Sequence, residues 1–445
     1  MTGPSGPRKI ESSVLAALSS LVDTLRSNGE LTHSTIGCSA TDMMETVLFA
    51  AKESPTDQLR SLALEGIALM ARRPALLTQL VIGGVIPILL GLLGPRDHQP
   101  ALSEIQTVWN VDAVAHIAGA SRANCDALLA AGAMGVLLPL VRADMSADLL
   151  DELFPALDHL MSGRPAAEMA AAVTSLGAVL MDGAVSAKLL FTCVRTFNEA
   201  VIKFAIGDPI LESWVESILS AASGFPQRLV DLLGNTGRSD VVDTVLRLMV
   251  NLFNAQTERL RQLFDCGLLD KLLPLLNEAG GEQTLLHAAS LCGNAADNEA
   301  FAPLLVDSTP IVQRMLALLA ISEGKTLHLA AGFFCHALRH CDRDMTRQLV
   351  DEHRALPPLV AALRRATIMM DDDALHLCLR SVAGVLIVGD AEAATLTNSR
   401  ELNPYILPLH GLGVFELADP LREHPNANLA EDARCVFSYS PIDIE

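Results

Sequence analysis

Apolar residues recur along the chain in short helical segments separated by polar turns. One order returns several times: a helix that ends in a small or polar residue, a short polar stretch, then Ala or Gly and an apolar helix that ends in Leu-Leu. Two examples are HIAGASRANCDALLAAGAMGVLLPLV from His116 and NLFNAQTERLRQLFDCGLLDKLLPLL from Asn251. Self-similarity of this kind predicts an array of helical repeats.

A glycine lies sixteen positions after the first residue of each example, at Gly132 and Gly267. Counting sixteen back from Gly84 lands on Ala68, in another helix-like segment. Two helices that meet at a sharp angle need a residue that tolerates left-handed backbone, and glycine has no Cβ to oppose it. We therefore expect a tight corner between two helices at each of these glycines.

Alignment on the first residue of the pattern gives a register for the array. The intervals from His116 to His159, Asn251 to Asn294, and Asn294 to His336 are 43, 43 and 42 residues. These intervals are typical of two- or three-helix α-solenoid repeats, and they are longer than tetratricopeptide or ankyrin repeats. The aligned positions are Ala68, His116, His159, Ser220, Asn251, Asn294, His336 and Val385.

We expect one elongated array rather than several domains, because no Pro/Gly/Ser-rich linker divides the middle of the 445 residues. The expected organisation is a disordered segment over 1–9, a single array of about nine or ten repeats over 10–437 and a flexible tail over 438–445. The pattern is degenerate over 165–240 and 380–405.

Composition agrees with an all-α fold. Half of the residues are apolar but only 4% are aromatic, which favours close-packed helices over sheet sandwiches. The formal charge is −20, from 52 acidic and 32 basic residues. That balance argues against nucleic acid and favours basic protein partners. The longest apolar stretch, 80–94, is interrupted by Gly and Pro, so we expect no membrane span.

The nine cysteines are odd in number and scattered, without a CxxC pair. Together with the lack of a secretory signal, they predict buried free thiols in a reducing compartment, the cytoplasm, the nucleus or both.

The segment TVWNVDAVAHIAGASRANCDALLAAGAMGVLLPLV and the later REHPNANLAEDA resemble the armadillo-repeat family, and distantly its importin-α members. The resemblance covers most of 60–435 as a pattern. It implies a right-handed superhelical α-solenoid of armadillo-type repeats whose third helices line a concave groove. It also implies that an Asn at the aligned position holds the backbone of an extended peptide, while a Trp four residues earlier stacks on basic side chains.

Asn occupies the aligned position only at Asn251 and Asn294, and His, which can also donate to a carbonyl, occupies three others. The Trp positions hold Leu64, Asp112, Pro155, Glu216, Arg247, Ser290 and Gly332. The candidate residues of a partner-binding groove are Trp109, Asp112, His116, Glu216, Asn251, Asn294 and His336.

Each candidate also has a structural interpretation. The groove Asn and His side chains could capture a peptide, or could bond to neighbouring helix ends and hold the repeats together. Trp109 could be a platform for a ligand or a packing residue, whereas Trp214 is expected to pack. His336 and His340 lie one helical turn apart, but zinc needs more ligands, so no metal is expected. Asp371–Asp373 is a solvated loop or an acidic contact for a basic partner.

No catalytic motif stands out, so we expect neither an enzyme nor a cofactor. The function expected is that of a noncatalytic scaffold or adaptor, which holds a partner protein or an extended segment along the groove. The alternative is an importin-α-like nuclear import adaptor that binds basic localisation signals. A chaperone cofactor or a cytoskeletal assembly factor remains a third possibility, by fold analogy alone.

Overall fold

The computed structural model describes residues 7–27, 40–54, 56–94, 101–142, 144–183, 185–205, 208–234, 238–255, 257–277, 281–396 and 403–440. Every regular element in these ranges is a helix. The chain divides into two compact units, one formed by 1–203 with 220–223 and the other by 204–219 with 224–445.

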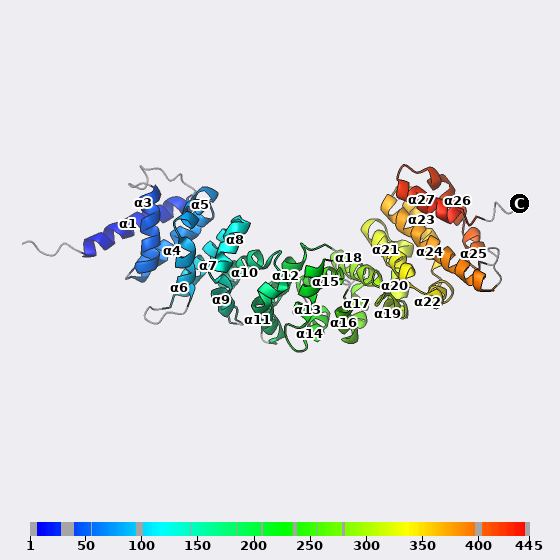
Figure 1. Cartoon of the computed structure of the whole chain (residues 1–445), viewed down its shortest axis with the longest axis horizontal. Coiled ribbons are helices and arrows are strands. Elements are labelled where there is room, and N and C mark those ends of the chain that lie inside the picture. The colour runs from blue at the N-terminus through cyan, green and yellow to red at the C-terminus, as the bar shows by residue number, and fades with distance from the viewer. Residues whose placement is uncertain are drawn as a thin grey trace, which may run out of the picture. The chain divides into compact units, whose positions relative to one another are not determined.

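The helices of the first unit form a stack of repeats (Figure 1). In each repeat the last helix, here named the third helix, packs on the third helix of the next: α1 on α4, α4 on α7, α7 on α10 and α10 on α12. The elements are α1 (Pro7–Arg26), α3 (Ala40–Glu53), α4 (Asp57–Ala71), α5 (Pro74–Ile82), α6 (Val85–Leu93), α7 (Glu104–Ala120), α8 (Arg122–Ala130), α9 (Ala133–Leu137), η1 (Leu138–Leu140), α10 (Ala147–Met161), η2 (Ala166–Met169), α11 (Ala170–Met181) and α12 (Ala187–Val201).

The second unit repeats this arrangement with α15, α18, α21, α24 and α27 as its third helices, each packed on the next. We call these two series the third-helix layers of the two units. The elements are α13 (Pro209–Leu219), α14 (Phe225–Leu233), α15 (Ser239–Phe253), η3 (Glu258–Leu260), α16 (Arg261–Asp265), α17 (Leu268–Leu275), α18 (Glu282–Ala296), α19 (Ala302–Val306), α20 (Thr309–Ile321), α21 (Gly324–His340), α22 (Arg343–Arg347), η5 (Gln348–Glu352), α23 (Leu356–Met369), α24 (Asp372–Leu396), α25 (Ile406–Gly411), α26 (Val414–Ala418), η7 (Asp419–Glu423) and α27 (Ala427–Phe437).

The glycine corners predicted from the sequence are confirmed. Gly84, Gly132 and Gly267 have φ of 80°, 85° and 85°, and each stands immediately before the second helix of its repeat. Gly224 and Gly413 do the same before α14 and α26, with φ of 79° and 77°. Left-handed backbone at these positions turns the chain sharply between the first and second helices.

One alignment from the sequence is wrong. Ser220 follows the end of α13, and α13 leads through the left-handed Gly224 into α14, so α13 is a first helix of its repeat. The missing third helix is α12, whose thirteenth residue is Glu199. The sequence alignment missed the repeat that contains α12, because no left-handed glycine separates η2 from α11 in this repeat.

Arginines of the second helices hold neighbouring repeats together in the second unit. Nε of Arg314, on α20, donates to the carbonyl of Leu276 at the end of α17, at 2.8 Å. Arg365, on α23, donates to the carbonyls of Leu319 and Ala320 in the last turn of α20. Because the last carbonyls of a helix have no partner within it, a side chain from the next repeat completes these helix ends.

The ends of the chain depart slightly from expectation. Helix α1 begins at Pro7, so it takes in the last three residues of the segment 1–9 that was expected to be disordered. Residues 1–6 and 441–445 lie outside the described residues. Trp214, expected to pack, is fully buried.

One described helix is long and apolar enough to cross a membrane by length and composition: α24, over Asp372–Ala393, with mean hydropathy 1.5. Two bent pairs, α5 with α6 and α8 with α9–η1, pass the same test together but bend by 81° and 69°. Half of the α24 window is buried, and α24 packs on α21, α23 and α27. The expectation of no membrane association stays a prediction.

Candidate partner-binding surface

Three candidate groove residues occupy matching places in the second unit. Asn251, Asn294 and His336 are each the thirteenth residue of their third helices, α15, α18 and α21, which pack one on the next. All three are partly exposed. The 42- and 43-residue intervals in the sequence therefore reflect a structural register.

The side chain of Asn294 bonds to the end of the preceding third helix. Its Nδ2 donates to the carbonyl of Val250 at 3.1 Å and to Oδ1 of Asn254 at 2.9 Å. Asn254 is the residue that ends α15. The sequence left this structural role open as the alternative to peptide capture, and the observed contacts are of the structural kind.

His336 makes a corresponding contact. Its Nδ1 lies 2.7 Å from Oδ1 of Asp297, the residue that ends α18, and Arg339 donates to the same oxygen at 2.9 Å. Burial lowers the pKa of His336, and the charge of Asp297 opposes that shift. His340 lies further away, 3.9 Å from Asp297. Within the described ranges, no three His, Cys, Asp or Glu side chains gather as a metal site.

In the first unit, Asp112 and His116 form a cluster with Arg72, the C-cap residue that directly follows α4. Asp112 is almost fully buried, and its Oδ2 accepts from Nε and Nη2 of Arg72 at 3.2 and 3.0 Å. Nδ1 of His116 lies 3.0 Å from Oδ1 and from the carbonyl oxygen of Asp112. The hydrogen bond with the Asp112 side chain raises the pKa of His116, against the opposite effect of burial.

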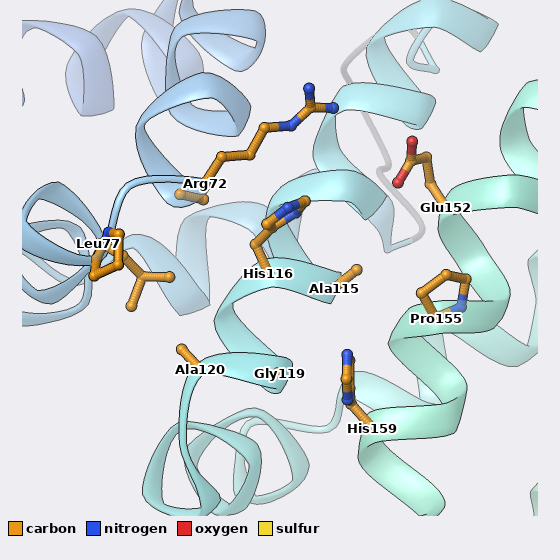
Figure 2. Close-up of a pocket in the computed structure, with 11 residues that line it drawn as sticks. Arg72, Leu77, Ala115, His116, Gly119, Ala120, Glu152, Pro155 and His159 are labelled. Atoms are coloured by element: carbon orange, nitrogen blue, oxygen red, sulfur yellow. The ribbon is translucent and has the colours of Figure 1, made fainter. Parts of the chain in front are cut away.

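A pocket of ≈ 530 Å³ opens beside this cluster (Figure 2). His116 faces it from α7, and Glu152, Pro155 and His159 face it from α10. Burial and the nearby charge of Asp112 raise the pKa of Glu152. The two carboxylates are thus close enough to repel each other, while the charge of Arg72, which also lines the pocket, opposes the rise of the Glu152 pKa.

The floor of the pocket depends on a close approach between α7 and α10. A Cβ on Gly119 would lie 2.7 Å from Nε2 of His159, so a larger residue here would require the imidazole to shift. Burial lowers the pKa of His159, and the positive charges of Lys203 and His116 act in the same direction. His159 therefore lines the pocket mainly in its neutral form.

The remaining candidates lie apart from these clusters. Trp109 is on α7, partly exposed, and is absent from the pocket lining. Glu216 is exposed on α13, where it lies 3.8 Å from Arg259. Because α13 is a first helix, the alignment that placed Glu216 in a third helix is corrected.

Sequence reasoning missed Arg72 and Glu152, and it aligned His159 without choosing it. Arg72 is one residue beyond its helix and Glu152 is seven residues before the aligned position, so neither shares the register that guided the choice. Their closeness depends on the packing of α4, α7 and α10. The repeat period in the sequence does not show which residues of neighbouring repeats come close to each other.

No sequence-family model and no curated protein sequence matches the chain. Its structure is similar to that of an engineered protein from the Northeast Structural Genomics Consortium, with a TM-score of 0.70 and 19% identity over 96% of this chain and 95% of that one.

A second similar structure comes from work on the phosphorylation switch between cadherin and β-catenin. It has a TM-score of 0.58 and 15% identity, over 88% of this chain and 69% of that chain. A designed armadillo repeat protein covers 60% of this chain, with a TM-score of 0.49 and 17% identity. The fold of the chain is an all-helical solenoid of armadillo-type repeats.

Proposed function

We propose that the protein is a noncatalytic scaffold that binds a partner protein, or an extended segment of one, on its third-helix layers. The observation that supports this most is the open pocket of the first unit, whose mostly apolar lining includes one carboxylate, that of Glu152. Pockets with few, well-placed polar groups on apolar walls are typical binding sites.

The chemistry of the pocket favours a basic side chain of the partner. Ala115, Gly119 and Pro155 offer an apolar path for a methylene stem, and Glu152 lies at the rim. Burial and then the charge of Asp112 raise the pKa of Glu152, and a cation brought next to Glu152 would favour its ionised form. The net charge of −20 would speed the approach of a basic partner.

An importin-α-like role, in which the chain carries basic localisation signals, is the narrower form of this proposal. It needs several sites for consecutive Lys or Arg side chains, and the Trp positions here hold other residues, among them Asp112 and Pro155. Calorimetry with a Lys/Arg-rich peptide at low salt tests it, since electrostatic capture is strongest there. If the peptide produces no heat of binding, the import role is rejected, but the scaffold proposal still stands.

We also propose the cytoplasm, the nucleus or both as the location. The cysteines of the described residues are free thiols. Burial raises the pKa of Cys292 and Cys378 to about 12, which keeps them protonated and unreactive.

The scaffold proposal is tested with pocket variants and a matched control. Partners are first recovered from the source cell, and the affinity of each purified partner is then measured for the wild type, Glu152→Gln, His159→Ala and Glu168→Gln. Glu168 is an exposed acid outside the pocket, so its variant should bind as the wild type does. Loss of affinity by about tenfold for Glu152→Gln supports the proposal. Unchanged affinity of every partner for both pocket variants would remove its basis.

A further inference from the structure

Large exposed apolar side chains lie at two successive corners between second and third helices in the second unit, after α20 and after α23. Ile321 ends α20 and is 67% exposed, while Ile368 and Met370, at the end of α23, are 81% and 84% exposed. Met369, between them, is 43% exposed. We name these four residues the corner patch. Clusters of large exposed apolar side chains commonly mark sites of protein interaction.

The packing of α20 on α23 brings the C-terminal turns of the two helices together. Arg365 of α23 reaches the carbonyls of Leu319 and Ala320, directly before Ile321. Ile368 is three residues after Arg365, so it continues the same face of α23 by one turn. Ile321 thus stands one residue after the carbonyl of Ala320 that accepts from Arg365, and Ile368 stands one turn after Arg365 itself.

Met370 has an unusual backbone for its residue type. It ends α23 in the left-handed region, with φ of 54°, where glycine is the ordinary residue. A methionine there is less favourable than glycine, because its Cβ crowds the backbone in this conformation. The chain thus keeps a strained residue whose large apolar side chain is almost wholly in solvent, although glycine would relieve the strain.

Acidic side chains border the patch. Glu323 follows Ile321 by two residues, and Asp371–Asp373 follow Met370. Asp371 accepts from the backbone N–H of Ala374, and Asp372 lies 3.5 Å from His424. Glu323 and Asp373 are exposed and make no hydrogen bond or ion pair with the described residues. Among the basic residues close to these positions in the sequence, Lys325 and Arg364 are exposed and Arg365 is partly exposed.

We propose that the corner patch is a docking site for an amphipathic helix of a partner protein, with apolar side chains on one face and Lys or Arg beside them. The apolar face would cover Ile321, Ile368 and Met370, and the basic side chains would pair with Glu323 and Asp373. A second copy of this chain is disfavoured, because two acidic borders would face each other. The acidic border likewise opposes docking on an anionic membrane.

The direct test uses the full chain and three synthetic peptides: a Leu/Lys amphipathic helix, the same composition scrambled, and a Leu/Glu helix. Fluorescence anisotropy gives each affinity at low and at physiological salt. The Leu/Lys helix should bind at least about tenfold more tightly than the other two, as burial of two or three apolar side chains and charge pairing predict. Equal binding of all three peptides overturns the proposal.

The site is located with variants that separate binding from folding. Met370→Gly removes the apolar side chain and relieves the left-handed strain, so it should raise the thermal midpoint while weakening peptide binding. Ile368→Ser should weaken binding further, and Asp373→Asn should reduce its salt dependence. Ile82→Ser is the matched control, because Ile82 is 82% exposed on α5 of the other unit; it should bind as the wild type does.

Two outcomes contradict the proposal at this stage. One is unchanged affinity of the Leu/Lys helix for the Met370→Gly, Ile368→Ser double variant. The other is binding of the full chain to vesicles through the patch without binding of the peptide. Hydrogen exchange provides an independent map: the peptide should protect the backbone around 319–323 and 366–373 and leave the region around Ile82 unchanged.

Discussion

Nδ1 of His336 lies 2.7 Å from Oδ1 of Asp297, so the middle of one third helix is joined to the end of the third helix before it. Asn294 and Asn254 make the same kind of link one repeat earlier, and Asp112 and Arg72 make it in the first unit. In these three places, the C-cap residue of one third helix therefore forms a polar contact with a side chain of the next third helix.

Replacing Asp297 should destabilise the second unit. Asp297→Ala leaves His336 and Arg339 without their shared acceptor, which should lower the free energy of unfolding by about 1–2 kcal/mol at neutral pH. Urea denaturation measures this. Glu299→Ala, which removes a nearby exposed acid, should change stability by less than about 0.5 kcal/mol.

The same variant should become more sensitive to acid. The folded pKa of His336 is already below its ordinary 6.5, so the unfolded chain binds more protons and stability falls as pH drops through 6.5 toward the folded pKa. Without Asp297 the pKa of His336 falls further. The loss of stability between pH 8 and pH 5 should therefore be larger in Asp297→Ala than in the wild type, and a smaller loss would contradict the assigned contact.

Two glycines three residues apart should respond in opposite ways to alanine. Gly132 has φ of 85°, whereas Gly135 lies inside α9, and a Cβ would meet nothing within 4 Å at either position. Gly132→Ala should cost about 1 kcal/mol from backbone conformation alone. Gly135→Ala should stabilise by up to about 1 kcal/mol. Thermal or urea unfolding of both variants gives the comparison, and the same sign for both would be inconsistent with the corner geometry.

Removal of a cap between repeats should loosen one helix end. Arg314→Ala leaves the carbonyl of Leu276 without its 2.8 Å donor and should cost about 1–2 kcal/mol. Hydrogen exchange should increase in the last turn of α17 more than elsewhere. Arg354→Ala is the control, since Arg354 is exposed and has no bonded partner among the described residues; it should change neither stability nor exchange.

Asp158 gives a pH dependence of the opposite sign in the first unit. Burial raises its pKa to about 6, with Glu199 adding to the shift and Thr196 and Arg195 opposing it. A raised folded pKa means that the contribution of Asp158 is fully present below 3.8 and is lost as pH rises through 6.

Asp158→Asn keeps an acceptor for Thr196 without the buried charge. We expect it to be more stable than the wild type by roughly 1–3 kcal/mol at pH 8, and by much less at pH 4. Denaturant titrations at the two pH values measure the difference. A variant that is less stable at pH 8 would show that the pairing with Arg195 outweighs the burial of the carboxylate.

The fold was predictable where one residue type marks one backbone conformation. Gly132 and Gly267 predict corners because glycine is the residue that most readily adopts left-handed backbone. The helices on either side of each corner are predicted by the periodicity of their apolar residues. The repeat ending in α12 has no such glycine, and the sequence alignment failed there.

The candidate site was less predictable because its contacts cross between repeats. The position of Asn294 follows from the period, but its partner depends on which residue ends α15. Glu152 and Asp112 approach each other only through the packing of α7 and α10. Similarly, the exposure of Ile368 and Met370 depends on where α20 ends, which no local pattern around 368–370 specifies.

In the second unit, the arginine caps between second helices all point the same way along the chain: the donor is on the later repeat and the acceptor on the earlier one. Arg314 completes a helix of the repeat before its own, and Arg365 does the same. In the second unit, truncation after α17 or after α20 therefore removes the arginine that completes the helix left at the end, whereas truncation before these helices removes only the acceptors of the caps. Shortened versions of the second unit should consequently tolerate the loss of repeats from its N-terminal side better than from its C-terminal side, unless a new cap is supplied.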